Sequence, residues 1–209
     1  MNESTLLIVF LKVPEPGFVK TRLAATVGPH KACEIYCELV EGQLERIRSF
    51  PNVELRIAPD DRIVECESWR QPHWTIRSQG GGDLGARMSR AFEEAFSSGW
   101  ERVLAIGSDC PYVGIDQIKD GSNSLDKKPV VLGPARDGGY WMIGMSRHLP
   151  SLFDGIEWST QKVLEQTMKK AAAQGESVSL LDTLEDIDDI DAWNRYTKGV
   201  CDGKVTQKG

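Results

Sequence analysis

The sequence lacks the paired cysteine and histidine motifs that build structural metal sites. Its cysteines, Cys33, Cys37, Cys66, Cys110 and Cys201, include no CxxC pair, and its three histidines are scattered. An odd number of cysteines also argues against a framework of disulfide bonds. We therefore expect reduced thiols in a cytoplasmic protein, without a zinc site.

Long hydrophobic runs and an excess of positive charge are also missing. The longest apolar run near the N-terminus, Leu6–Leu11, is too short to cross a bilayer, and no positive residue precedes it as in a signal peptide. The net charge is −6 and the pI is about 5.2, which is unsuited to general binding of nucleic acid. We expect neither membrane insertion nor nucleic acid binding, so an anionic ligand needs a local basic site.

A phosphate-binding P-loop of the form GxxxxGK followed by serine or threonine is absent as well. In VPEPGFVKTRL, residues 13–23, two residues separate Gly17 from Lys20 and no glycine lies upstream. The segment nevertheless has parts that suit phosphate, although a surface loop with solvated cations is the alternative. A helix expected to begin near Val19 would add its N-terminal amides. The other parts are the cations Lys12, Lys20 and Arg22, the hydroxyl of Thr21, the flexible Gly17 and the stiffening Pro14 and Pro16.

What the chain does contain is an alternation of strand-like and helical segments. Strands are expected at 6–11, 53–58, 73–78, 102–107, 129–134, 140–145 and 178–182, and helices at 31–47, 83–96, 159–175 and 189–199. This order predicts an α/β fold with a largely parallel sheet, in one domain over residues 1–200 with a frayed tail at 201–209. Ligands of such sheets bind at the carboxyl ends of the strands.

One aspartate follows the strand expected at 102–107. Asp109 in the sequence GSDCP is a natural ligand for magnesium, which prefers oxygen and takes one or two carboxylates together with phosphates. The alternative is a helix N-cap, a position that serine and aspartate both favour.

A glycine-rich segment, QGGGDLGARM, precedes the helix expected at 83–96. Its glycines allow a flat ligand to approach the backbone, and the Gln79 amide could read the edge of a nucleobase. A flexible turn is the competing interpretation.

Two further polar segments have both a functional and a structural interpretation. Arg136, Asp137 and Tyr140 lie in a segment that suits a polar acceptor such as a sugar, or a hairpin turn followed by core aromatics. The acidic run from Glu185 to Asp191 is either a solvated helix start or a second set of metal carboxylates, with Asp186 and Asp188 as a DxD pair. The spacing excludes an EF-hand.

Taken together, PxPGxVKTRLA, QGxGDLGxRM, GSDxP, GPAxDGGYxxIG, WST and the DxD-rich ending resemble the bacterial DUF2064 proteins. These are called selenodomain-associated or CofC-like transferases of the nucleotide-diphospho-sugar transferase (GT-A) superfamily. The resemblance runs from Leu6 to about Trp193. It implies a three-layer α/β/α GT-A fold and, at the matching positions, a nucleotide-binding loop, base contacts and a metal site. One departure is that Asp189 and Trp193 replace the threonine and leucine of the usual DxDTxxDL ending, which leaves the second metal ligand open.

The expected site residues fall into four groups. Catalytic roles are assigned to Lys20, Arg22 and Asp109. Nucleotide binding is assigned to Lys12, Pro14, Gly17, Lys20, Thr21, Arg22, Gln79, Gly81, Gly82, Asp83 and Gly85. Acceptor binding is assigned to Arg136, Asp137, Gly138, Gly139 and Tyr140. Metal binding, of Mg²⁺ or Mn²⁺, is assigned to Asp109, Asp186 and Asp188.

Three functions fit these residues. The first is a magnesium-dependent nucleotidyltransferase that moves NMP from an NTP to a phosphorylated small-molecule acceptor and releases pyrophosphate. The second is a GT-A glycosyltransferase that uses a nucleotide-diphospho-sugar. The third is a nucleotide-binding module without catalysis. Two features favour the first function. The central strand is followed by a single aspartate in an Asp-Cys-Pro sequence rather than by a DxD motif, and the cationic loop suits a triphosphate.

Overall fold

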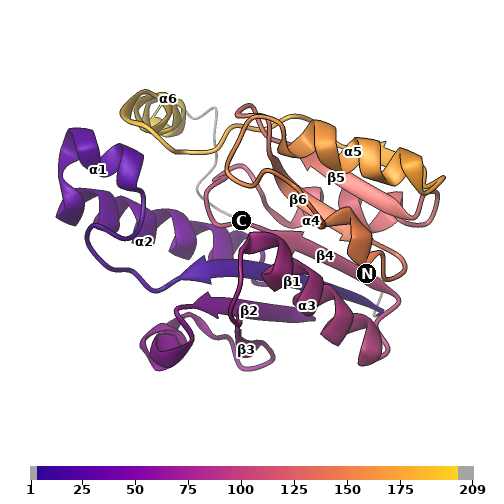
Figure 1. The fold of residues 1–209 in the computed structure, drawn as a ribbon. Coiled ribbons are helices and arrows are strands. Elements are labelled where there is room, and N and C mark those ends of the chain that lie inside the picture. The colour runs from indigo at the N-terminus through magenta and orange to yellow at the C-terminus, as the bar shows by residue number, and fades with distance from the viewer. Residues whose placement is uncertain (1–3, 202–209) are drawn as a thin grey trace.

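The structure is a computed structural model that describes residues 4–201, and its centre is a seven-stranded sheet (Figure 1). The strand order is β3-β2-β1-β4-β6-β5-β7. β6 runs antiparallel to β4 and β5, and the other neighbouring pairs are parallel, which confirms a mostly parallel sheet. The strands are β1 (Thr5–Lys12), β2 (Val53–Ala58), β3 (Thr75–Ser78), β4 (Arg102–Ile106), β5 (Val130–Pro134), β6 (Tyr140–Met145) and β7 (Val178–Leu180).

Helices cover both faces of this sheet, so the predicted three-layer α/β/α architecture is confirmed (Figure 1). α2, α4 and the 3₁₀ segment η1 pack on one face, and α3 and α5 pack on the other. The helices are α1 (Thr21–Val27), α2 (Pro29–Arg46), α3 (Leu84–Ser97), α4 (Ile115–Ser124), α5 (Val163–Ala173) and α6 (Ile190–Cys201), and the 3₁₀ segments are η1 (Asp60–Trp69) and η2 (Pro150–Leu152).

The apolar run of β1 explains why this strand lies inside the sheet. Alternate side chains of a strand point to opposite faces, so Leu7 and Val9 enter the cluster beneath α2, while Leu6 and Ile8 enter the cluster beneath α3. A strand that is buried on both faces is apolar without alternation. The continuous hydrophobic run is therefore the sequence signal of a central strand.

A third apolar cluster joins α1, α2 and α6 outside the sheet. It contains Leu23 of α1, Ile35 of α2, Tyr196 of α6 and Ile187 of the segment that precedes α6. This cluster holds α6, at the end of the described chain, against α1 and α2, so it places two distant parts of the sequence beside each other.

Some expected element boundaries are wrong. The first helix begins at Thr21 rather than near Val19, and α5 begins at Val163 rather than at a cap of Ser159 or Thr160. Ser159 instead has φ 63, in the left-handed region. By contrast, Asp83 caps α3 as predicted, because its side chain accepts a hydrogen bond from the Ala86 amide.

Two expectations concern the thiols and the tail. The cysteines whose side chains the structure describes, Cys33, Cys37, Cys66 and Cys110, are free thiols, as expected. The predicted fraying of the tail falls on 202–209, outside the described residues, apart from Cys201, which belongs to α6. Between residues 4 and 201, no helix combines the length and apolar character needed to span a bilayer.

Candidate active site

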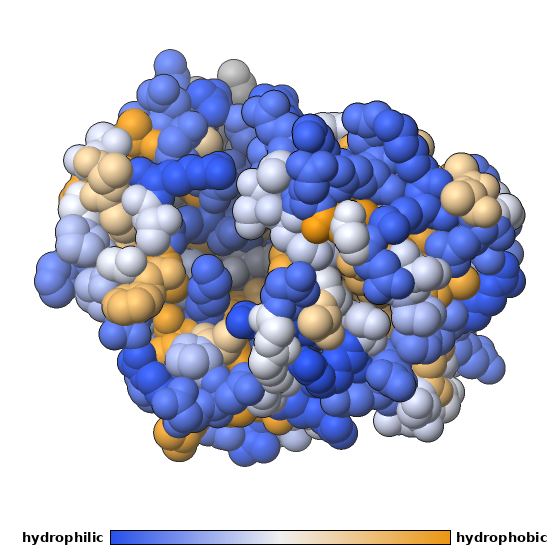
Figure 2. All heavy atoms as spheres, in the orientation of Figure 1, coloured by the Kyte–Doolittle hydropathy of each residue, from blue (hydrophilic) through white to orange (hydrophobic). Residues whose placement is uncertain are grey.

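A cavity of about 610 Å³ lies at the carboxyl ends of β1 and β4. The face of the molecule seen in Figure 2 is hollowed near the ends of these strands, and mostly hydrophilic residues surround the hollow. The charged residues that line the cavity are Lys12, Lys20, Arg22, Arg87, Asp109, Asp137, Asp186 and Asp188. The structure therefore brings together every residue that the sequence assigned to catalysis or to metal binding.

Lys20 occupies the middle of this charged group. Its Nζ lies 2.6 Å from Oδ1 of Asp109 and 3.4 Å from Oδ1 of Asp188, and only 3% of its side chain is exposed. Lys20 precedes α1 with φ 48 and ψ 47, a left-handed conformation that is uncommon for a residue with a side chain. Arg22, which is 70% exposed, contacts the other oxygen of Asp188 at 3.5 Å.

The acidic run before α6 belongs to the cavity, and its members have different roles. The Ile187 amide donates to the Asp109 carbonyl at 2.9 Å, which joins this run to the segment after β4. Asp186 and Asp188 line the cavity, whereas the Asp189 side chain accepts a hydrogen bond from the Ala192 amide at the start of α6. Asp189 is therefore a helix cap, which leaves Asp186 and Asp188 as the candidate ligands.

The carboxylates are close enough to oppose one another's ionisation. Burial, followed by the charges of Asp109, Asp137 and Asp188, raises the pKa of Asp186 to about 7. Negative charge is thus concentrated at this end of the cavity, and Lys20 partly neutralises it. This concentration of negative charge would favour the binding of a cation in the cavity.

The carboxylates of Asp109, Asp186 and Asp188 are suitable ligands for magnesium, although their oxygens are not yet arranged around a common position. Carboxylate oxygens are the ligands that this ion prefers. Among residues 4–201, no group of three or more aspartate, glutamate, histidine or cysteine side chains is already arranged to hold a metal ion. The Lys20 ammonium lies between Asp109 and Asp188 instead.

The basic loop is held in place by a buried tyrosine that the sequence did not single out. The Tyr36 hydroxyl accepts a hydrogen bond from the Lys12 amide at 2.8 Å and donates one to the Lys12 carbonyl at 2.9 Å. Lys12, Thr21 and Arg22 all line the cavity, whereas Pro14 and Gly17 lie outside its wall. Gly17 has φ 87, so its role is to shape the turn.

Gln79 lines the cavity, but its amide is already engaged by the protein. Its Nε2 donates to the carbonyls of Leu11 and Arg56 at 2.7 and 3.0 Å, and its Oε1 accepts from Arg87 at 3.3 Å. Both hydrogens of the amide are thus engaged by backbone carbonyls, which counts against its predicted role as a reader of a nucleobase edge. Gln79 instead ties β1, β2 and α3 together beneath the cavity.

The remaining residues of the glycine-rich segment also have structural roles. Gly81, Gly82, Asp83 and Gly85 lie outside the cavity wall, and Arg90 donates to the carbonyls of Gln79 and Gly81. A Cβ atom at Gly85 would lie 2.6 Å from Nε1 of Trp158, so this glycine allows the indole to pack against α3. Besides Gln79, the residues of this segment that line the cavity are Leu84 and Arg87.

The predicted acceptor segment is the turn between β5 and β6, and only part of it faces the cavity. Asp137, Gly139 and Tyr140 line the wall. Arg136 lies outside the wall, with Nη1 3.6 Å from a carboxylate oxygen of Glu185. Gly138 also lies outside and packs against the backbone of residue 161. The hairpin interpretation is confirmed by the antiparallel pairing of β5 and β6, and the acceptor role of Asp137, Gly139 and Tyr140 stays a prediction.

The sequence missed the wall that the segment before α5 forms. The cavity is also lined by Trp158, Ser159, Thr160 and Val163. The available signal was the WST motif, which contributed to the family resemblance but was given no role. Its position beside the turn between β5 and β6 places it on the side expected for an acceptor.

Comparison with known proteins decides the family. The model described as "Uncharacterized protein conserved in bacteria (DUF2064)" matches residues 44–160, which is more than half of the chain. The chain belongs to the DUF2064 family. A structure from Desulfovibrio desulfuricans G20, named "putative nucleotide-diphospho-sugar transferase", is 32% identical to this DUF2064 protein. It matches with a TM-score of 0.88 over 94% of this chain and 87% of that chain. No curated protein matches the sequence.

More distant structures share the fold of this DUF2064 protein. The 4-diphosphocytidyl-2C-methyl-D-erythritolsynthase from Anaerococcus prevotii DSM 20548 is 14% identical, with a TM-score of 0.59 over 94% of this chain and 97% of that chain. The inositol-1-phosphate CTP transferase from T. maritima is 12% identical, with a TM-score of 0.55 over 97% of both chains. At these identities the likeness shows the fold alone, and the predicted superfamily fold is confirmed.

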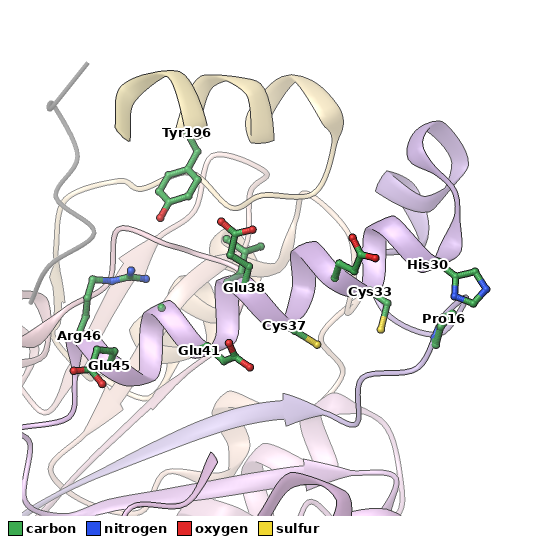
Figure 3. A pocket seen from close by; sticks show the side chains of 12 residues that line it. Pro16, His30, Cys33, Cys37, Glu38, Glu41, Glu45, Arg46 and Tyr196 are labelled. Atoms are coloured by element: carbon green, nitrogen blue, oxygen red, sulfur yellow. The ribbon is translucent and has the colours of Figure 1, made fainter. Parts of the chain in front are cut away.

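A second cavity of about 710 Å³ lies along α2 of this DUF2064 protein (Figure 3), and it shares none of its described lining residues with the first cavity. Its wall carries Glu34, Glu38, Glu41 and Glu45, with Arg46 at one end. This excess of negative charge opposes the binding of phosphate groups. The smaller cavity is therefore the candidate active site.

Proposed function

We propose that this protein is a magnesium-dependent nucleotidyltransferase, which transfers NMP from an NTP to a phosphorylated small molecule. The observation that carries the proposal is the single cavity in which Lys12, Lys20 and Arg22 meet the carboxylates of Asp109, Asp186 and Asp188. Cations suit the phosphates of a nucleotide, and carboxylates suit the metal that accompanies it. The location at the carboxyl ends of the parallel strands is where α/β sheets bind ligands.

The chemistry asks mainly for positioning and charge neutralisation. An oxygen of the acceptor phosphate attacks the α-phosphorus, the bond between that phosphorus and its bridging oxygen to the β-phosphorus breaks, and pyrophosphate leaves. Lys12 and Arg22 would hold the triphosphate, and Tyr36 fixes the backbone from which Lys12 projects. Asp109, with Asp186 or Asp188, would hold magnesium, which when bound supplies positive charge to the phosphates.

The acceptor would lie against the turn between β5 and β6 and the segment before α5. Asp137, Ser159 and Thr160 offer polar groups there, and Tyr140 and Trp158 offer ring surfaces. The fold also serves an inositol-1-phosphate CTP transferase, whose name includes a phosphorylated acceptor. That support is an analogy of fold.

Glycosyl transfer from a nucleotide-diphospho-sugar is the second candidate, and the name of the relative from Desulfovibrio desulfuricans G20 favours it. Against it stands the single carboxylate after β4, where Asp109 is followed by Cys110 and Pro111 rather than by a second acidic residue. The two candidates differ in their released product, since only nucleotidyl transfer from an NTP releases pyrophosphate.

A pyrophosphate-release assay with each of the four NTPs, magnesium and a set of sugar phosphates tests the proposal. We expect pyrophosphate release with one NTP and only in the presence of magnesium. In the Asp109→Asn variant, which loses a charge from the metal site, the rate of release should fall by about a hundredfold or more. The control is Asp120→Asn, an exposed aspartate on α4, which should keep full activity. Release of a nucleoside diphosphate from a sugar nucleotide, without pyrophosphate release from any NTP, would establish glycosyl transfer instead.

A further inference from the structure

Lys20 was assigned to phosphate binding, but its ammonium group already pairs with two carboxylates of the cavity. Its ammonium nitrogen lies 2.6 Å from Asp109 and 3.4 Å from Asp188, two carboxylates that come from distant parts of the chain. A phosphate-binding lysine that waits for its ligand would lie free in the cavity. Lys20 is instead buried to 97% of its side chain and already engaged by the carboxylates.

We propose that Lys20 is a built-in counter-ion that occupies the place of the divalent cation until that cation displaces it. The metal and the Lys20 ammonium then compete for the same oxygens of Asp109 and Asp188. This inference rests on the proposed function only in placing a divalent cation at these carboxylates, and it adds what Lys20 does before the cation arrives.

The local backbone supports a fixed position for this lysine. Lys20 has a left-handed conformation, φ 48 and ψ 47, which costs about 1 kcal/mol for a residue with a side chain and needs a compensating contact. The two ion pairs supply that contact. Arg22 differs in both respects, because it lies within α1, is 70% exposed and contacts Asp188 at 3.5 Å.

Competition follows from the distances. A metal ion that bridges Asp109 and Asp188 would have to lie between the two Oδ1 atoms, where the Lys20 ammonium now lies at 2.6 and 3.4 Å, and two cations repel each other strongly at one position. Without Lys20, the negative charges of Asp109 and Asp188 would face the cavity without the ammonium that now lies between them. The lysine therefore stabilises the empty cavity at the expense of metal affinity.

The displaced ammonium would remain beside the cavity, where nucleotide phosphates give it a new partner. A metal ion that binds without nucleotide must displace the Lys20 ammonium from the carboxylates and leave it unpaired. When a nucleotide binds together with the metal, its phosphates pair with the displaced ammonium. Metal and nucleotide should thus strengthen each other's binding, and a coupling of this kind is reciprocal.

The test measures binding of Mn²⁺ without nucleotide, by electron paramagnetic resonance of the free ion, in wild type, Lys20→Met and Arg22→Met. We expect Lys20→Met to bind Mn²⁺ about tenfold more tightly than wild type, which is the effect of one adjacent charge on a protonation equilibrium. Arg22→Met is the matched control and should change the affinity by a smaller factor. An affinity in Lys20→Met at or below that of wild type, or an equal gain in Arg22→Met, would overturn the inference.

A second measurement on the wild-type protein avoids the risk that Lys20→Met fails to fold. Side-chain NMR of ¹⁵N-lysine protein, with Lys20 assigned by its loss in Lys20→Arg, should show the Lys20 ammonium signal shift when Mg²⁺ alone is added. A signal that stays unchanged while Mg²⁺ binds would contradict displacement. Neither readout involves NTP turnover, so the inference survives if metal competition holds and pyrophosphate release fails.

Discussion

At the scale of single residues, Gly138 determines how closely two walls of the cavity approach each other. It has φ 89, and a Cβ atom placed on it would lie 2.2 Å from the carbonyl oxygen of Gln161. The Gly138 carbonyl accepts a hydrogen bond from the Leu164 amide at 3.0 Å. The turn between β5 and β6 and the start of α5 are therefore in contact through their backbones, which positions Asp137 relative to Ser159 and Thr160.

Gly138→Ala should consequently destabilise the protein more than an alanine at a comparable glycine in open space. Gly99 is the matched control, since it has φ 91 and nothing lies within 4 Å of a Cβ atom there. We expect Gly99→Ala to lower the free energy of unfolding by about 1–2 kcal/mol through backbone strain. Gly138→Ala should lower it by at least about 2 kcal/mol more, because the backbone of residue 161 must move. Urea denaturation measures both, and equal losses would contradict the proposed contact.

At the scale of elements, the short segment between β7 and α6 links an apolar cluster to the charged cavity. Ile187 is fully buried in the cluster of α1, α2 and α6, while its neighbours Asp186 and Asp188 face the cavity. Its amide also bonds to the Asp109 carbonyl. The apolar side chain thus anchors the two carboxylates on either side of it.

Ile187→Ala should therefore affect stability and the site together. Removal of a buried isoleucine to alanine costs about 2–5 kcal/mol of the free energy of unfolding. We expect a loss in this range by urea denaturation, together with weaker Mn²⁺ binding as the carboxylates lose their anchor. Leu180→Ala, on β7 with 52% exposure, is the control and should change stability by less than about 1 kcal/mol. If the Ile187→Ala protein is less stable but binds Mn²⁺ with unchanged affinity, burial of Ile187 does not position the carboxylates of Asp186 and Asp188.

At the scale of the whole molecule, the fold was largely predictable from the sequence, because strand-like apolar runs and helical periods depend on local patterns. All seven strands were predicted, and the charged cavity followed from the rule that ligands bind at their carboxyl ends. The antiparallel course of β6 was not predicted, since periodicity does not encode strand direction. The helix expected near Val19 and the helix expected at 31–47 correspond to α1 and α2, and Gly28 with φ 84, followed by Pro29, marks the boundary between them.

The site was predictable in the identity of its charged residues, but not in their contacts. Gln79 was expected to meet a ligand, yet its amide bonds to Leu11 and Arg56, which lie in other strands. Likewise, the sequence left open which carboxylate of the acidic run is the second metal ligand, and only the start of α6 shows that Asp189 is a cap. The direct contact between Lys20 and Asp109 spans 89 positions, a distance over which sequence patterns carry no information.

The measurement that tests the central claim most directly is the melting temperature with each of the four NTPs and several nucleotide-diphospho-sugars, with and without magnesium. A ligand that binds only the folded protein raises Tm by mass action. We predict a magnesium-dependent rise with one NTP that is lost in the double variant Lys12→Ala, Arg22→Ala, which removes the two cations proposed to hold the triphosphate. A rise with a sugar nucleotide and none with its parent NTP would favour glycosyl transfer. No rise with any nucleotide, or an equal rise in the double variant, would contradict the assignment of this cavity to nucleotide phosphates.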